Sequence, residues 1–199
     1  QQDTATAMKE ALTQGAQLAV SELGKPGGFS NNPDVRIELP GKLGSAARTL
    51  KMMGMGNQII ALETSMNQAA EAAVPQAQSI LVNAISRMSL TDAKSVLTGG
   101  NDSATQYLER SSREEIRALF LPVVKQATDQ VGVAQQYNAF ASQAAGFGVV
   151  DANATSVETY VTEKALDGLF EMIAQQEATI RSNPAAAATS MARKVFGAL

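Results

Sequence analysis

The chain has 199 residues, of which 45% are hydrophobic and 18% are charged, and its formal net charge is −3. It contains no histidine and no cysteine. The commonest general base, the commonest metal ligand and the best side-chain nucleophile are therefore absent, and a Ser-His-Asp triad is impossible. No basic patch suits nucleic acid, because Arg110, Arg113 and Arg117 are interleaved with glutamates. No apolar run is long enough to span a membrane.

The first third of the chain predicts a helix followed by an irregular arm. Apolar residues recur at helical spacing over 4–23, and Gly24 then ends the helix. Residues 24–40 contain three prolines and three glycines, which forbid regular helix. Within them Val35, Ile37 and Leu39 alternate with charged residues. The pattern predicts an extended arm packed on the body of the protein, or one short strand.

The middle of the chain predicts a series of broken helices. A helix is expected over 42–53, and a long helix over 57–87 that Pro75 kinks or splits. Ser89 begins a short helix with Asp92 at capping-box distance, and Gly99-Gly100 end it.

The remaining helices are predicted from their caps. Asn101 and Asp102 are expected to cap one helix, and Ser112-Arg113-Glu114-Glu115 reads as a capping box that begins another, which runs to about 130. Further helices are expected over 133–145 and 156–181, and a last one after Asn183.

These patterns predict an all-α fold. We expect an irregular multi-helix bundle of about eight or nine helices, with the Pro/Gly-rich arm near residues 24–40. The whole chain, 1–199, is expected to form a single helical domain with C-terminal helices over 156–199.

Two sequence features suggest charged ligands. Glu163, Asp167 and Glu171 are four residues apart on one helical face, where they could bind a cation, act as acid and base, or form a solvated surface. The glycine-rich loop 99–103 could bind an anion with its backbone N–H groups, or serve only as the end of one helix and the cap of the next. Glu109–Arg113 and Glu177–Arg181 read as ordinary ion pairs, each worth about 0.2–0.5 kcal/mol.

Two further features suggest apolar or polar contacts. Asn67 and Glu71 adjoin inward positions of an alanine-rich helix, so they could hydrogen-bond a neighbouring helix or the arm, or face a ligand cleft. Three methionines cluster around a glycine break in the sequence: Met52, Met53 and Met55. They could form a binding site for a hydrophobic ligand or partner, or they could pack in the core.

Several segments in order resemble one bacterial family. They are ALTQGAQLAVSELGKPGGFSNNPDVRIELP, ETSMNQAAEAAVP, LTGGNDSATQYL, VTEKALDGLFEMIAQQEATIRSNP and the closing KVFG. Over nearly its whole length the chain resembles the family called domain of unknown function 4197. Leu108 and Gln176 depart from its pattern, where a phenylalanine and an acid are expected. The resemblance implies a mostly helical protein of Gram-negative bacteria, made with an N-terminal signal peptide or lipoprotein signal, and it implies no activity, cofactor or catalytic residue.

The leading functional hypothesis is a non-enzymatic binding or interaction module. Its partner would be an apolar small molecule, a lipid or an envelope protein, bound without cofactor or metal. The start at Gln1, without methionine, suggests a mature chain after signal cleavage or a trimmed one, and with the resemblance it indicates a periplasmic or outer-envelope location. Oligomeric state is left open. The candidate ligand-binding residues are Asn67, Glu71, Thr105, Tyr107, Lys164 and Asp167.

Two alternatives stay open at this point. The chain could be a carboxylate-based hydrolase or lyase, with or without a divalent cation, using Glu71, Asp167 and Glu171 with help from Lys164 or Tyr107. It could also be a structural homo-oligomer, which would expose an apolar patch at a symmetric interface.

Overall fold

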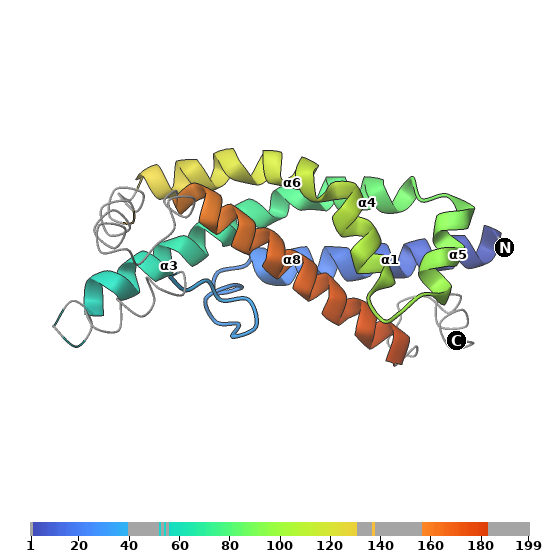
Figure 1. Ribbon diagram of the computed structural model, residues 1–199, viewed down its shortest axis with the longest axis horizontal. Helices are drawn as coiled ribbons and strands as arrows, with labels where there is room; N and C mark the ends of the chain where they lie inside the picture. The colour runs from blue at the N-terminus through green and yellow to red at the C-terminus, as the bar shows by residue number, and fades with distance from the viewer. Residues whose placement is uncertain are drawn as a thin grey trace, which may run out of the picture. The chain divides into compact units, whose positions relative to one another are not determined.

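The computed structural model of the protein describes residues 2–39, 52, 54, 56–130, 137 and 157–182. The helices in these residues are α1 (Gln2–Gly24), α3 (Gly56–Ala73), α4 (Gln78–Ser86), α5 (Leu90–Thr98), α6 (Ser103–Gln130) and α8 (Val157–Ser182), with the 3-10 turn η2 (Val74–Ala77) between α3 and α4 (Figure 1). No strand occurs in the described residues. The all-α prediction is therefore confirmed.

The predicted count of eight or nine helices is not supported, since the described part of the chain holds fewer. The helices expected over 42–53, over 133–145 and after Asn183 lie outside the described residues, apart from Met52 and Tyr137.

The described residues pack into two compact units. The first unit contains residues 2–22, 75–116 and 169–182, and the second contains residues 23–39, 56–74, 117–130 and 157–168, together with 52, 54 and 137. Each unit has its own buried apolar side chains. In the first they include Met8, Leu81, Ile85, Leu108 and Ile116, and in the second Leu23, Phe29, Ile37, Met66 and Phe120. The expectation of a single domain stays a prediction.

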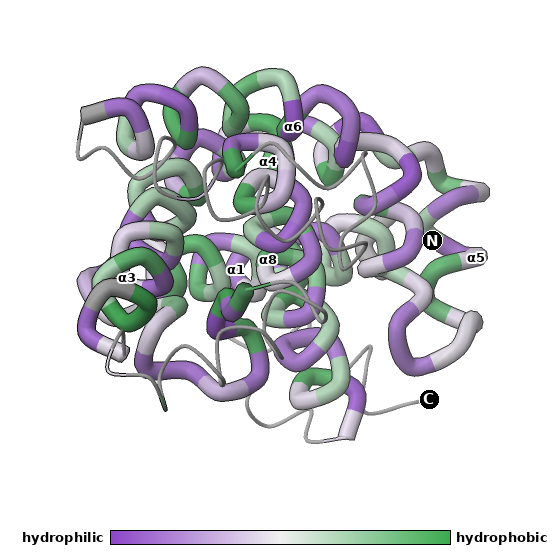
Figure 2. Tube along the Cα trace, turned by 60° about the vertical axis from the view of Figure 1, so that its left-hand side comes forward, coloured by the Kyte–Doolittle hydropathy of each residue, from purple (hydrophilic) through white to green (hydrophobic). Residues whose placement is uncertain are grey.

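Helical periodicity identified the buried faces of the long helices correctly. The apolar residues that recur at helical spacing on α1, α3 and α8 are buried: Met8, Leu12, Ala16, Ala19, Val20 and Leu23; Ile59, Leu62, Met66, Ala69, Ala70 and Ala73; and Leu166, Leu169, Phe170 and Ile173. Figure 2 shows the hydrophilic and hydrophobic residues alternating around the turns of these amphipathic helices. Burial of each apolar stripe, rather than helix propensity alone, stabilises such helices.

Residues 25–39 form the predicted arm after α1. Val35, Ile37 and Leu39 are buried, whereas Arg36 and Glu38 between them are exposed, so the alternation of the sequence is kept. The alternative of a short strand is wrong for residues 35–39, which form no strand and have no partner strand in the described part of the chain.

Pro75 splits the predicted long helix as expected. The α-helix α3 ends at Ala73, Val74–Ala77 form a single 3-10 turn, and α4 resumes at Gln78. Proline lacks the backbone N–H and its ring clashes with the carbonyl four residues earlier, which accounts for the break.

The capping box predicted at Ser112 is wrong. α6 runs without interruption from Ser103 to Gln130, so Ser112 lies in its interior and Pro122 lies inside it as well. The buried Ser112 hydroxyl donates to the carbonyl oxygen of Leu108, one turn earlier. Serine can satisfy its hydroxyl within a helix in this way, so the local motif did not require a helix start.

Candidate functional site

The amino end of α6 is occupied by a carboxylate from α8. Glu177, which is 2% exposed, accepts hydrogen bonds from the backbone N–H groups of Ala104 at 2.9 Å and Thr105 at 2.8 Å, and from the Thr105 hydroxyl at 2.8 Å. The first N–H groups of a helix have no partner within the helix and attract negative charge. Residues 99–103 therefore do precede an anion site, but the anion is the protein's own Glu177, which replaces Asn101 and Asp102 as the cap.

Arg181 connects this carboxylate to the carboxyl end of α5. Its guanidinium donates to Glu177, and also to the carbonyl oxygens of Val96 at 2.8 Å and Leu97 at 3.2 Å. It further donates to the Ser103 hydroxyl, which itself donates to the Val96 oxygen. Carbonyls at the end of a helix lack helical partners and attract cations. The Glu177–Arg181 pair thus fixes the end of α5 to the start of α6.

A hollow of about 400 Å³ lies between α1 and α5 in the first unit. It is lined by Ala5 and Met8 of α1 and by Leu90, Thr91, Ala93, Lys94, Leu97 and Thr98 of α5. Ligand pockets in proteins range from about 300 to 1,000 Å³ and are mostly apolar, with a few polar groups. The volume and lining of this hollow, called the α1–α5 pocket below, match that description.

Both ends of α5 are held in place. At its start the Ser89 side chain accepts the backbone N–H of Asp92 at 3.0 Å, which confirms the predicted cap. At its end Arg181 binds the last carbonyls, as described above. The wall of the α1–α5 pocket is therefore pre-formed rather than left to fold around a ligand. Leu90, at the first turn of α5, is 52% exposed and belongs to the lining, so its side chain is accessible to a ligand.

A second hollow follows α1 and α4 and differs in chemistry. It has a volume of about 510 Å³ and is lined mainly by amide and hydroxyl side chains such as Gln17, Gln76, Gln78 and Asn83. Exposed neutral polar groups of this kind are well solvated and need no ligand.

Glu71 and Asn67 of α3, both predicted site residues, hold the arm in the second unit. The Glu71 carboxylate accepts three backbone N–H groups, from Gly27 at 3.2 Å, Phe29 at 3.0 Å and Ser30 at 3.3 Å. Gly27 has a φ of 82°, a left-handed conformation that glycine adopts without strain and that turns its N–H toward the carboxylate. Both side chains are buried and engaged, so the structure supports the arm-binding alternative for this pair.

The Asn67 amide binds the arm as a neighbouring strand would. Its oxygen accepts the N–H of Ile37 at 2.8 Å, and its nitrogen donates to the carbonyl oxygen of the same residue at 2.9 Å. The nitrogen also donates to the Glu63 carbonyl oxygen at 2.7 Å. One side chain thus satisfies both backbone groups of Ile37, which has no strand beside it among the residues that the structure describes, as buried backbone groups require.

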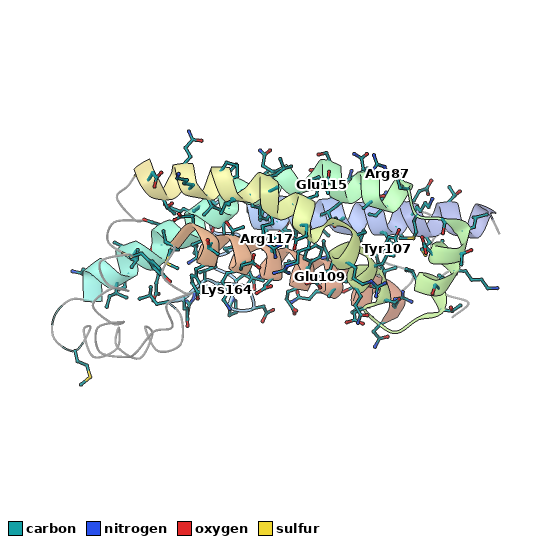
Figure 3. All side chains as sticks on the ribbon, turned by 45° about the horizontal axis from the view of Figure 1, so that its top comes forward. Arg87, Tyr107, Glu109, Glu115, Arg117 and Lys164 are labelled. Carbon is teal, nitrogen blue, oxygen red and sulfur yellow. The ribbon has the colours of Figure 1, made fainter. Side chains whose placement is uncertain are left out.

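Lys164 of α8, which is labelled in Figure 3, lies in the second unit beside a pair of stacked tyrosines. Its ammonium is 5.9 Å from the centre of the Tyr160 ring, and the Tyr160 and Tyr137 ring centres are 6.2 Å apart. Burial raises the pKa of Tyr137 to about 12. The pKa of Tyr160 is raised further, first by burial and then by the charges of Tyr137, Glu38 and Glu63, and its hydroxyl donates to the Glu38 carbonyl oxygen.

Tyr107, on α6 in the first unit (Figure 3), is close to Asp92 of α5. Its pKa is raised by burial, by the charge of Asp92 and by a hydrogen bond to that carboxylate. Tyr107 therefore contacts the face of α5 that carries Asp92 and does not line the α1–α5 pocket.

The predicted carboxylate row on α8 does not assemble a metal site. Glu163 pairs with Arg117 of α6, the Glu171 carboxylate accepts the side-chain amide of Gln175, and Asp167 is exposed. Within the described residues no three carboxylates gather closely enough to hold a cation. Since Glu71 is already bound to three amides, the arrangement lends no support to carboxylate catalysis by that residue.

Among the predicted methionines only Met52 lies in the described residues, and it is 90% exposed. The interpretation of this cluster as core packing is therefore wrong for Met52. Met53 and Met55 lie outside the described residues.

The six candidate residues fall into two units: Thr105 and Tyr107 in the first, and Asn67, Glu71, Lys164 and Asp167 in the second. None of them lines the α1–α5 pocket. Sequence reasoning missed this pocket because Leu90, Ala93 and Leu97 recur at ordinary helical spacing, which is also the pattern of core residues. The sequence feature that could have indicated the pocket is Lys94, a single cation next to this apolar stripe and among small apolar and hydroxyl residues.

No helix in the described residues combines the length and apolarity needed to cross a membrane. Comparison of the chain with curated proteins and with solved structures finds no match. A family match does exist, and it covers residues 1–197, nearly the full length, as the ordered segments of the sequence predict. The chain therefore belongs to the family described as "Protein of unknown function (DUF4197)".

Proposed function

We infer that the protein is a non-enzymatic binding module, which takes up a small apolar or amphipathic molecule in the α1–α5 pocket. One observation carries this proposal. The pocket has a volume of about 400 Å³, apolar side chains from two helices, and a half-exposed leucine, Leu90, at its lining. Burying such apolar surface against a ligand yields about 25 cal/mol per Å².

The hydrogen bonds of two buried glutamates, one in each unit, support a carrier rather than a catalyst. The buried carboxylates of Glu71 and Glu177 are committed to backbone N–H groups, so neither has the open position that a general acid or base needs. The periplasm or outer envelope remains the proposed location, on the strength of the sequence resemblance.

A neutral fluorescent probe tests the proposal without involving charge. N-phenyl-1-naphthylamine becomes bright when it leaves water for an apolar site, and we expect the protein to enhance its emission with saturable binding. Thr91→Trp places a bulky ring at an exposed lining position of α5 and should abolish this enhancement.

Ser95→Trp provides the matched control, because Ser95 is exposed on the same helix and is not part of the lining. It should bind the probe as the natural protein does. Equal binding by the two tryptophan variants would show that the probe binds elsewhere and would overturn the proposal. Native mass spectrometry of protein from its own host then gives the mass of the natural ligand.

A further inference from the structure

The α1–α5 pocket carries an asymmetry of charge. Among the described residues that line it only Lys94 is charged, and the hydroxyls of Thr91 and Thr98 lie three residues before it and four after it on the same helix. Residues three or four apart share one face of a helix. The polar lining therefore forms one cationic, hydroxyl-bearing strip on α5, and the remaining lining is aliphatic, with a thioether from Met8.

The Lys94 ammonium has no carboxylate partner among the described residues. Two other cations of the first unit have partners: Arg181 binds Glu177, and Lys9 donates to the carbonyl oxygen of Ser86. The hydroxyl of Thr98 donates to the backbone oxygen of Lys94, which fixes the threonine and leaves the lysine side chain available. A positive charge at an apolar cavity favours an anionic ligand over a neutral or cationic one of equal shape.

We propose that the ligand of the α1–α5 pocket is a fatty acid, with its carboxylate at Lys94 and its chain against Met8, Leu90 and Leu97. This inference rests on the proposed function and specifies its ligand. The volume of about 400 Å³ is near the lower end of the range of ligand pockets, which suits one alkyl chain rather than two. The Thr91 hydroxyl can donate to the second carboxylate oxygen, as polar groups do when they orient a ligand.

Three amphiphiles with the same alkyl chain and different head groups test the fatty-acid inference separately from the proposed binding function. Dodecanoate, dodecanol and dodecylammonium are titrated against the bound N-phenyl-1-naphthylamine near neutral pH, below their micelle concentrations. Dodecanoate should bind at least about threefold more tightly than dodecanol, and dodecylammonium more weakly than both, because exposed ion pairs contribute modestly. Salt at about 1 M should remove most of this preference by screening.

Lys94→Met keeps the aliphatic stem and removes the charge, so it should bind dodecanoate and dodecanol equally. Lys125→Met removes the same charge from an exposed position of α6 and should keep the preference for dodecanoate. If all three amphiphiles displace the probe equally from the natural protein, the fatty-acid inference is overturned and the apolar pocket stands. If the probe itself does not bind, the proposed function fails as well.

Discussion

Glu177 and Arg181, one turn apart on α8, form an ion pair whose side chains are only 2% and 11% exposed, with N–O contact at 2.9 Å. The pair is more than the ordinary i,i+4 contact that the sequence suggests. The glutamate caps the start of α6, and the arginine caps the end of α5. Two helix ends of opposite polarity thus meet two charges of the matching sign.

Glu177→Gln should therefore destabilise the protein strongly. The substitution leaves the Arg181 charge nearly buried without its partner and weakens two backbone contacts of α6, and breaking a buried pair from one side costs about 3–5 kcal/mol. Urea unfolding followed by circular dichroism measures the change in the free energy of unfolding. Glu109→Gln is the control, since Glu109 is 42% exposed in its pair with Arg113 and its loss should cost at most about 0.5 kcal/mol. Similar losses in the two variants would show that burial of the Glu177 pair is energetically irrelevant.

A second prediction concerns how closely the arm packs on α8. A Cβ added at Gly168 would lie 2.7 Å from the Phe29 ring and 3.2 Å from the Cβ of Val35. Both neighbours are buried and cannot move aside freely, so Gly168→Ala should cost about 1–3 kcal/mol of unfolding free energy.

Gly15→Ala is the matched substitution in α1. Its Cβ would meet Gln176 at 3.4 Å and Ile180 at 3.7 Å, which are ordinary contact distances. Since alanine favours helix over glycine by about 1 kcal/mol, Gly15→Ala should leave stability unchanged or raise it. Thermal unfolding of both variants measures the difference. Equal unfolding midpoints would mean that the arm accommodates the methyl group of Gly168→Ala without loss of stability, which would contradict the prediction.

The sequence was sufficient for those parts of the fold that local pattern controls. The apolar stripe of α1, the break at Pro75 and the cap at Ser89 all depend on residues within a few positions of one another, and each is found in the structure. Ser112 failed as a helix start because its hydroxyl has two local solutions, a cap or a bond to the preceding turn. Sequence proximity does not choose between them.

The candidate site could be predicted only in part, because its contacts join residues far apart in sequence. Glu177 caps a helix that begins more than 70 positions earlier, since it lies 73 residues from Ala104, and no periodicity carries that information. Asn67 and Glu71 were recognisable as polar residues on an apolar face, but their partners belong to an arm some 30 to 44 residues away. The α1–α5 pocket depends on how two amphipathic helices are spaced, which composition does not encode.

A third prediction concerns the amide of Asn67, which both accepts from and donates to Ile37. Asn67→Asp keeps the acceptor but sets a carboxylate oxygen against the carbonyl oxygens of Ile37 and Glu63. The expected loss is at least about 2 kcal/mol, because one oxygen of the buried carboxylate then faces two carbonyl oxygens and lacks a donor. Hydrogen exchange at the Ile37 amide should accelerate in step with this loss. Asn83→Asp, at an exposed position of α4, makes the same chemical change and should alter neither measurement.

The last prediction concerns alkaline pH. Burial raises the pKa of Tyr137 from 10.0 to about 12, and the pKa of Tyr160 is raised as well. The folded state therefore holds these protons more tightly than the unfolded state. This contribution to stability is complete below pH 10, the pKa of the unfolded chain, and is lost as the pH rises through about 12. Tyr137→Phe removes one of the two ionisable hydroxyls, so its free energy of unfolding should fall less steeply over that interval. Lysines and arginines also titrate there, but they are common to both proteins and cancel in the difference between the slopes.

Tyr107→Phe is the control, and it should change the slope less, because the Tyr107 ring is partly exposed. Identical slopes for the natural protein and Tyr137→Phe would show that the Tyr137 hydroxyl ionises in the folded state as readily as in the unfolded chain.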